Sequence, residues 1–398
     1  MTSADSHAQP IVVFGPWSER YDFGAQHPLT PRRFGPGIDL LRLTGADRFL
    51  EPEPAGDDAL RRLHDGSYIE VVRAFSVHPD GPPRMGIGPG DCPAFSGMHE
   101  ASAAVAGGSL TAMTAILEGT TEHAFHPGGG LHHAMATRAS GFCIYDDVAL
   151  GVVAARDAGH RVLYVDLDVH HGDGVQALFW DDPEVMTVSI HESGEYLFPG
   201  TGSVLESGGP SAPGRAVNLP LEPFSGDGSW LPIVESVVPA LAAAFQPTML
   251  VTQHGCDSHA NDPLAHLRLT TRAYDRATRL LDGLAHEHCD GRWLATGGGG
   301  YDVHRVVPRS WALVWLAQAH RAVPPAVPVA WRERWQAAAA DFDQGGLPEA
   351  YLDPADLMEP DPARLVDINR VSAERSLAQS LRLLARQRAP GSPARRGR

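Results

Sequence analysis

Three aspartates and two adjacent histidines crowd the stretch "YVDLDVHHGDG", residues 164–174. The preceding residues, "HRVLYV", are apolar enough for a buried strand. Burying a carboxylate is costly unless it is paired or binds a metal. Side chains alternate along a strand, so Asp166 and Asp168 face the same way, and His170 follows two residues later. The spacing predicts that Asp168 and His170 converge on one cation.

A second polar stretch, "TQHGCDSHANDP" (252–263), follows another predicted strand and offers Asp257 as a third ligand. Three protein ligands with one position left for water are typical of catalytic metal sites. Oxygen and nitrogen ligands without a thiolate suit Zn²⁺ and also Fe²⁺. His254 and His259 are rival ligands that the spacing does not exclude, whereas we expect Cys256 to be a small packing residue.

The stretch "HPGGGLHHA" (126–134) carries groups for proton transfer. Three glycines let the backbone approach a ligand closely. His132 and His133 follow them, and either imidazole could move a proton. Asp166 and Asp173 are acids outside the predicted ligand set that could orient these rings.

The glycine-rich stretch "TGGGGYD" (296–302) follows a further predicted strand. It lacks the Lys-Ser/Thr that ends a phosphate-binding P-loop, so we reject that interpretation. We expect instead a flexible loop that presents Tyr301 to the site. Its phenol can donate a hydrogen bond to an oxygen that becomes negative during a reaction.

Strand-like and helix-like segments alternate along the chain and must position these residues. The strand-like segments are 11–14, 161–167, 185–191, 247–255 and 292–297, and the helix-like segments are 97–119, 146–159 and 271–288. This alternation predicts βαβ units and an α/β fold, a single large three-layer α/β/α domain with a mainly parallel sheet. Ligands bind beyond the carboxyl ends of strands in such sheets.

The 398 residues are ample for one large domain, and 43% of them are hydrophobic. We expect a catalytic domain over residues 10–320, preceded by a disordered N-terminus at 1–9. After residue 320 the pattern weakens to a partly helical extension, 321–385, and a disordered tail, 386–398.

The formal net charge of −16 argues against nucleic-acid binding. The four cysteines are far apart and form no Cys-x-x-Cys pair, which is typical of a reduced intracellular protein. The first ten residues lack the basic and apolar segments of a signal peptide. No apolar run approaches the roughly 20 residues of a membrane span. We therefore expect a cytoplasmic protein without membrane partners; the oligomeric state is not predicted.

Five motifs occur in the order found in the zinc-dependent class I histone deacetylase family of the arginase/deacetylase superfamily. They are "HPLTPRR" (27–33), "HPGGGLHHA" (126–134), "VDLDVHHGDG" (165–174), "FPGTG" (198–202) and "GGGGYD" (297–302). The resemblance covers roughly residues 10–320 and implies an arginase/deacetylase-like fold. Two further stretches, 90–103 and 251–267, resemble most closely the bacterial acetoin-utilisation (AcuC-like) branch.

The resemblance implies a metal site and a structural cation site. By this resemblance Asp168, His170 and Asp257 bind zinc, with Fe²⁺ as the alternative. It also implies a structural potassium site, formed partly by backbone carbonyls, at Asp166, Asp168, His170, Ser189 and Ile190.

The resemblance also implies the catalytic roles. His133 is the general base and then the general acid, and His132 tunes the region of the oxyanion. Asp166 and Asp173 lie behind the two histidines. Tyr301 polarises the acetyl carbonyl.

Substrate contacts follow from the same resemblance. Gly141, Phe142 and Phe198 line an acyl-lysine tunnel, Leu264 lies near its mouth, Asp91 holds substrate backbone at the rim, and Arg33 lies deeper, near an acetate-release pocket. Two positions depart from the eukaryotic pattern: Gly90 replaces the usual Tyr before the rim aspartate, and Cys256 replaces an Ala. These departures argue against a histone substrate and leave the predicted chemistry unchanged.

The implied activity is removal of acetyl or other acyl groups from protein lysines, with release of acetate. The AcuC-like resemblance implies a metabolic enzyme, such as an acetyl-CoA synthetase, as the acetylated partner in acetoin catabolism. The alternatives are an acetylpolyamine amidohydrolase and a non-catalytic acyl-lysine-binding module. An arginase-type ureohydrolase is disfavoured, because "DSHANDP" lacks the second Asp of a metal-bridging pair.

Overall fold

The structure is a computed structural model that describes residues 9–341 and 346–388. The predicted disordered termini therefore lie outside the described residues, except for Gln9 and for residues 386–388, which continue the last helix.

An eight-stranded sheet forms the centre of the described chain, in the order β2-β1-β3-β8-β7-β4-β5-β6. All its neighbouring strands pair in parallel. The strands are β1 (Ile11–Val13), β2 (Phe49–Leu50), β3 (His123–His126), β4 (Val162–Asp166), β5 (Val185–Glu192), β6 (Ala216–Leu221), β7 (Met249–Gln253) and β8 (Trp293–Thr296). The predicted parallel α/β sheet is confirmed.

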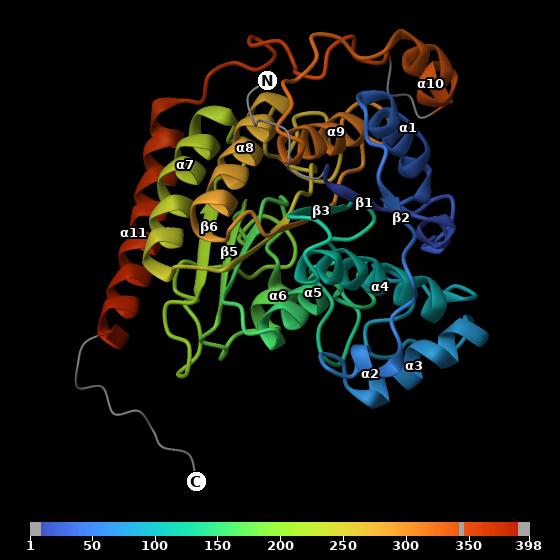
Figure 1. The fold of residues 1–398 in the computed structure, drawn as a ribbon, viewed down its shortest axis with the longest axis horizontal. Coiled ribbons are helices and arrows are strands. Elements are labelled where there is room, and N and C mark those ends of the chain that lie inside the picture. The colour runs from blue at the N-terminus through green and yellow to red at the C-terminus, as the bar shows by residue number, and fades with distance from the viewer. Residues whose placement is uncertain (1–8, 342–345, 389–398) are drawn as a thin grey trace.

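Helices cover both faces of this sheet, which gives the three predicted layers (Figure 1). The layer drawn above the sheet contains α1 (Phe34–Thr44), α7 (Asp227–Phe245), α8 (Thr271–His288) and α9 (Val307–Gln318). The layer drawn below it contains α4 (Met98–Leu117), α5 (Asp147–Asp157) and α6 (Asp173–Leu178). Along β4, Leu163 and Val165 join the core of one layer, and Val162 and Tyr164 join the core of the other. This alternation is what a strand buried on both faces requires.

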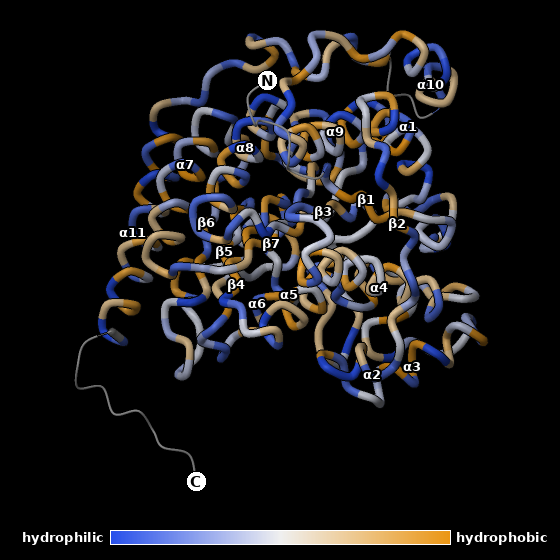
Figure 2. Tube along the Cα trace, viewed as in Figure 1, coloured by the Kyte–Doolittle hydropathy of each residue, from blue (hydrophilic) through white to orange (hydrophobic). Residues whose placement is uncertain are grey.

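The remaining helices lie at the periphery. They are η1 (Pro16–Arg20), η2 (Pro31–Arg33), α2 (Asp57–Leu60), α3 (Gly66–Val77), α10 (Val329–Asp341) and α11 (Ala363–Arg388). The long helix α11 runs alongside α7 at the edge of the molecule, and orange and blue alternate along it (Figures 1 and 2). Its Ala373 and Leu384 are buried in the same core as the sheet. The segment after residue 320 therefore packs on the predicted catalytic domain.

Two helices, α4 and α7, are long and apolar enough to cross a membrane by length and composition. The expectation that no run approaches this length was therefore wrong. In the structure, 72% of the apolar 18-residue stretch of α4 and 50% of that of α7 are buried against the rest of the chain. Helices that pack into the core of a large α/β domain reach this composition without a membrane.

The sheet order explains how distant motifs meet. The strands β3, β8, β7 and β4 are neighbours at the centre of the sheet. The predicted catalytic stretches follow their carboxyl ends, at 127–134, 297–302, 254–262 and 167–173. Parallel strands bring all four carboxyl ends to one edge, where α/β sheets bind ligands.

Candidate active site and metal centre

Asp168, His170 and Asp257 converge at this edge. His170 Nδ1 lies 3.1 Å from Asp168 Oδ1 and 3.1 Å from Asp257 Oδ2. One ligand atom from each residue lies within 4.8 Å of the other two. Both carboxylates are buried, and 12% of the His170 side chain is exposed.

The surroundings of these three residues fit a divalent cation. Gln253 Nε2 and the Gly299 N–H donate to Asp168 Oδ2 at 2.7 and 2.8 Å, and the Val169 N–H donates to Asp257 Oδ1 at 2.9 Å. These hydrogen bonds fix the orientation of both carboxylates, as is usual for side chains that bind a metal. Burial and then the charge of Asp168 raise the pKa of Asp257 to about 6. A cation between two buried carboxylates offsets that repulsion.

The two rival histidines point elsewhere. His254 Nε2 lies 2.7 Å from Thr252 Oγ1, and His259 Nε2 lies 2.9 Å from Asp353 Oδ2. Neither belongs to the cluster of Asp168, His170 and Asp257. The alternative ligand set that the sequence left open is thus not supported by the geometry. Cys256 is buried in the core, which agrees with a packing role.

His132 and His133 each have a carboxylate behind them, as the sequence predicted. His132 Nδ1 lies 2.7 Å from Asp166 Oδ2, and His133 Nδ1 lies 2.6 Å from Asp173 Oδ1. A proton on Nδ1 that is held by a carboxylate leaves Nε2 to face a substrate. Tyr164, which the sequence analysis did not single out, donates to Asp166 Oδ2 at 2.6 Å.

The pKa values of the two imidazoles are shifted in opposite directions. Burial lowers the pKa of His132, but the charges of Asp166 and Asp168 outweigh it and raise this pKa to about 10. Burial and the positive charge of His132 lower the pKa of His133 to about 4. Near neutral pH, His133 is therefore the ring that can accept a proton.

The loop that carries both histidines is anchored by Asp147, the first residue of α5. Its carboxylate accepts hydrogen bonds from Gly130 N at 3.1 Å, Leu131 N at 2.8 Å and Ser109 Oγ at 2.5 Å. From the sequence, Asp147 was expected only as part of the helix-like segment 146–159. Asp147 is fully buried, whereas an acid at the start of a helix is usually exposed.

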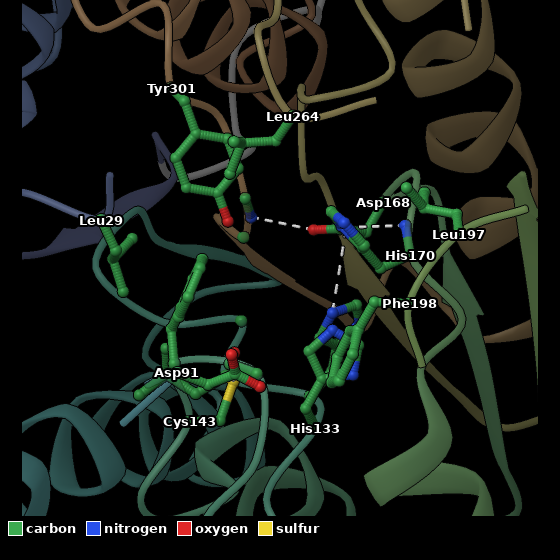
Figure 3. A pocket seen from close by; sticks show the side chains of 17 residues that line it. Leu29, Asp91, His133, Cys143, Asp168, His170, Leu197, Phe198, Leu264 and Tyr301 are labelled. Atoms are coloured by element: carbon green, nitrogen blue, oxygen red, sulfur yellow. Dashed lines mark hydrogen bonds and ion pairs between the residues drawn. The ribbon is translucent and has the colours of Figure 1, made fainter. Parts of the chain in front are cut away.

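A pocket of about 220 Å³ opens onto these groups (Figure 3). Its walls include the predicted substrate contacts Asp91, Gly141, Phe142, Phe198 and Leu264. They also include apolar residues that the sequence analysis missed, namely Leu29, Leu131 and Leu197. These leucines lie in loops, where no periodicity marks them. The result is a largely apolar channel that ends at Asp168 and His170.

Gly141 permits the wall to close against His133. Its φ of +50° lies in the left-handed region, which favours glycine. A Cβ at this position would lie 2.4 Å from His133 Cδ2 and 2.8 Å from Phe198 Cε1. The backbone can therefore approach the imidazole only without a side chain here.

Tyr301 lies across the pocket from His133, and its hydroxyl points into the pocket (Figure 3). Burial, followed by the charges of Asp257 and Asp168, raises the pKa of this phenol well above its ordinary value. The hydroxyl thus stays protonated and can donate a hydrogen bond. The Tyr301 N–H donates to Asp262 Oδ2 at 2.8 Å, a positioning contact that the sequence analysis missed.

Comparison with known proteins supports the identity that these groups indicate. Residues 27–318 match the family model described as "Histone deacetylase domain". The chain belongs to the histone deacetylase family.

Within the family the chain falls in the AcuC branch. It is 40% identical over 363 residues to "Acetoin utilization protein AcuC" of Bacillus subtilis (strain 168), an alignment that covers 89% of this chain and 92% of the relative. The protein of the same name from Staphylococcus xylosus is 36% identical over 325 residues, covering 80% and 84%. A crystal structure titled as an HDAC homolog complexed with SAHA has a TM-score of 0.81 and 27% identity, covering 92% of this chain and 99% of that one.

As a histone deacetylase family member, the chain is a hydrolase of the acyl amidohydrolase type. One predicted substrate contact of this deacetylase, Arg33, lies beside the pocket and does not line it. Arg33 is buried and donates from Nη1 to the Gly298 carbonyl at 2.6 Å. It borders a small second cavity that shares Leu29 and Leu131 with the pocket, so it lies behind the pocket wall, and the acetate-release role stays a prediction.

The residues predicted for potassium lie on neighbouring segments of this deacetylase fold. Asp166 and Ser189 are paired across β4 and β5, and Ile190 follows on β5. The Asp168 N–H donates to Asp166 Oδ1 at 3.1 Å, and the His170 N–H donates to Asp168 Oδ1 at 3.0 Å. The segment thus curls back on itself. Its binding of potassium stays a prediction.

Proposed function

We propose that the chain is a zinc-dependent lysine deacylase that hydrolyses acetyl-lysine on proteins and releases acetate. One observation carries the proposal. A largely apolar channel ends where Asp168 and His170, which cluster with the buried Asp257, the imidazole of His133 and the phenol of Tyr301 face one space. A neutral acyl-lysine stem fits such a channel, whereas a charged lysine would lose its hydration there.

Asp168, His170 and Asp257 would hold the cation, and their oxygen and nitrogen atoms suit Zn²⁺, with Fe²⁺ as the alternative. A divalent cation at such a site polarises an acyl carbonyl and makes a water molecule more acidic. Potassium, bound at the segment around Asp166 and Ser189, would be structural.

The proton transfers fall to His133. Its Nδ1 is held by Asp173, so Nε2 can accept the proton of the attacking water. As the amide C–N bond breaks, the same nitrogen gives a proton to the leaving amine. A carbon–oxygen bond replaces the carbon–nitrogen bond, and the products are acetate and a free lysine.

The negative charge that develops on the acyl oxygen is stabilised by two groups of the chain. The Tyr301 hydroxyl donates a hydrogen bond to it, and the charged His132 imidazole lies nearby, its ring centroid 4.0 Å from that of His133. Donors that wait in place for a developing oxyanion lower the barrier more than they stabilise the neutral carbonyl.

A protein substrate is supported by the mouth of the channel. Asp91 is exposed and lines the pocket, where its carboxylate can accept a hydrogen bond from a substrate backbone N–H. Phe198 at the same mouth is 40% exposed and offers an apolar contact. We propose acetylated metabolic enzymes as substrates, an acetyl-CoA synthetase among them, in line with the acetoin-utilization name of the relatives.

We also propose that the enzyme works in the cytoplasm of a bacterium. All four cysteines are free and buried, and the relatives come from Bacillus and Staphylococcus. Free cysteines are typical of a reducing compartment.

The test is hydrolysis of a panel of acylated peptides and acetylpolyamines by the purified chain, with metal content measured in the same samples. We expect acetate release from acetyl-lysine peptides with about one active-site zinc per chain. Turnover of acetylpolyamines alone would identify a small-amine hydrolase instead. Peptide binding without turnover in the metal-loaded chain would identify a binding module.

A further inference from the structure

Three histidines and one aspartate gather at the opposite end of the sheet from the active site. His123 is the first residue of β3, whose other end leads into the loop of His132 and His133. Asp282 and His286 lie one turn apart near the C-terminal end of α8. His320 follows the end of α9 by two residues. The four side chains thus come from three separate elements.

The distances among these side chains are those of a metal site. His320 Nε2 lies 3.2 Å from Asp282 Oδ1 and 3.1 Å from His286 Nε2. Asp282 Oδ1 lies 3.6 Å from His286 Nε2 and 3.7 Å from His123 Nε2. One ligand atom from each residue lies within 4.8 Å of the others. A tetrahedral Zn²⁺ with bonds near 2.0–2.1 Å separates its ligand atoms by about 3.4 Å.

A hydrogen bond outside the cluster orients its most buried member. His123 Nδ1 lies 2.8 Å from the Gln318 carbonyl oxygen. A carbonyl can only accept, so Nδ1 carries the proton, and in the neutral ring the lone pair is then on Nε2, the atom that faces Asp282. Metal-binding histidines commonly hold their second nitrogen in this way. The tautomer required of a ligand is therefore already set.

The position also favours a cation and lets one enter. The C-terminal ends of α8 and α9 meet here, and helix C-termini carry partial negative charge. His123 is buried, whereas 34% of the His286 side chain and 38% of the His320 side chain are exposed. The cluster is thus anchored on the strand and open at the surface.

We propose that His123, Asp282, His286 and His320 form a second zinc site, separate from the active site. An ion there joins the first residue of β3 to the ends of α8 and α9. The site is structural, because it lies at the end of the sheet away from the reacting groups. Its role is to hold two helices of one layer against a central strand.

The test uses the full chain, stripped of metal with a chelator and titrated with Zn²⁺ against a chromophoric competitor. We expect two zinc ions per chain for the wild type and one for the His286→Ala/His320→Ala double variant. The Asp257→Ala variant should also retain one. The control is His288→Ala, which alters a histidine of the same helix end that lies outside the cluster, and it should retain two.

Two further measurements separate metal binding from folding and from catalysis. In the Asp257→Ala background, saturating Zn²⁺ should raise the melting temperature, and adding His286→Ala/His320→Ala should abolish that rise. With Co²⁺ in place of Zn²⁺, the Asp257→Ala variant should show the intense visible absorption of a four-coordinate site. The double variant should keep wild-type hydrolysis when its active site is loaded.

The outcomes that overturn the proposal are distinct from those that overturn the deacylase function. If the double variant binds as many zinc ions as the wild type, or if the Asp257→Ala chain binds none, the cluster is only a hydrogen-bonded group of imidazoles. Asp282→Asn provides a second, smaller change that should likewise remove one zinc ion. A wild type that binds two zinc ions yet hydrolyses no acyl-lysine would refute the deacylase function and leave the second site standing.

Discussion

The backbone N–H of Gly299 donates to Asp168 Oδ2 at 2.8 Å, and this bond ties the loop of Tyr301 to a predicted metal ligand. Gly299 comes two residues before Tyr301, in the loop after β8, while Asp168 follows β4. The strand β7 lies between β8 and β4 in the sheet. A direct contact between two loops thus fixes the proposed oxyanion donor relative to the predicted metal centre.

This contact leaves no room for a side chain. A Cβ on Gly299 would lie 2.0 Å from Asp257 Oδ2, so Gly299→Ala must displace a ligand. We expect the variant to lose metal affinity by about 10–100-fold, as outer-group changes at metal sites do. Zinc titration checks this. Gly283→Ala on α8, where an added Cβ meets no atom within 4 Å, should bind zinc like the wild type.

Asp257→Ala removes one of three protein ligands. We expect the protein to fold, to lose the active-site metal and to lose hydrolysis, because two ligands bind a divalent cation poorly. Metal analysis beside an acetate-release assay checks this. Full occupancy and turnover in the variant would show that the ligand set is wrong.

His133→Ala should lose more activity than His132→Ala. In the proposed mechanism His133 moves the proton, and general acid–base catalysis is typically worth ~10²–10⁴-fold. His132 contributes charge and should cost less when removed. The comparison needs kcat measured for both variants at equal metal loading. Small and equal losses would exclude both rings from the chemistry.

Tyr301→Phe keeps the ring and removes only the donor. We expect kcat to fall by ~10²–10³-fold, the cost of one oxyanion donor elsewhere, with metal content and melting temperature nearly unchanged. Binding of an acetyl-lysine peptide should weaken much less, because the neutral carbonyl gains less from the phenol. Turnover at the wild-type rate would reduce Tyr301 to a packing residue.

Asp353 should make the protein sensitive to acid. Burial would raise its pKa, but hydrogen bonds from His259 and Thr271 and the charge of Arg309, 2.7 Å away, hold the pKa well below its ordinary value. A carboxyl whose pKa is lowered by folding stabilises the protein above its unfolded pKa of about 3.9, and this stabilisation is lost as pH falls toward the folded pKa.

Asp353→Asn tests this directly. At pH 7 it should lower the free energy of unfolding by about 3–5 kcal/mol, because the buried Arg309 loses its partner. Between about pH 5 and 3 the variant should lose less stability than the wild type. Urea unfolding at pH 7, pH 5 and pH 3 checks both expectations. Parallel curves for the two proteins would show that Asp353 does not titrate with unfolding.

The layered α/β fold could be predicted because its long strands are apolar and its helices lie between them. The strands β1, β4, β5, β7 and β8 were all expected, whereas β2, β3 and β6 were not. The strand β2 has only two residues, and β3 begins and ends with histidine. The strand β6 contains Pro220, which an edge strand tolerates and a sequence pattern penalises.

Some residues of the candidate site could be predicted from the sequence, and others could not. Residues with distinctive chemistry, such as Asp257 and His133, stood out from type and spacing. The roles of Leu29 and Asp147 could not be predicted in this way, because a leucine in a loop and an acid at a helix start are common in any protein. Asp262 had the chemistry but was not singled out, and only the fold shows that its carboxylate holds the Tyr301 backbone.

The placement of β8 between β3 and β7 has a consequence for the candidate site. A ribosome makes β3 first and β8 last among the four central strands. Without Trp293–Thr296, the pairings of β8 with β3 and with β7 are missing, and the remaining strand pairs fall into two groups, β2-β1-β3 and β7-β4-β5-β6. The predicted catalytic histidines follow β3, in one group, and Asp168 and Asp257 follow β4 and β7, in the other. The two halves of the candidate site are therefore joined through the four-residue strand β8, which pairs with both groups.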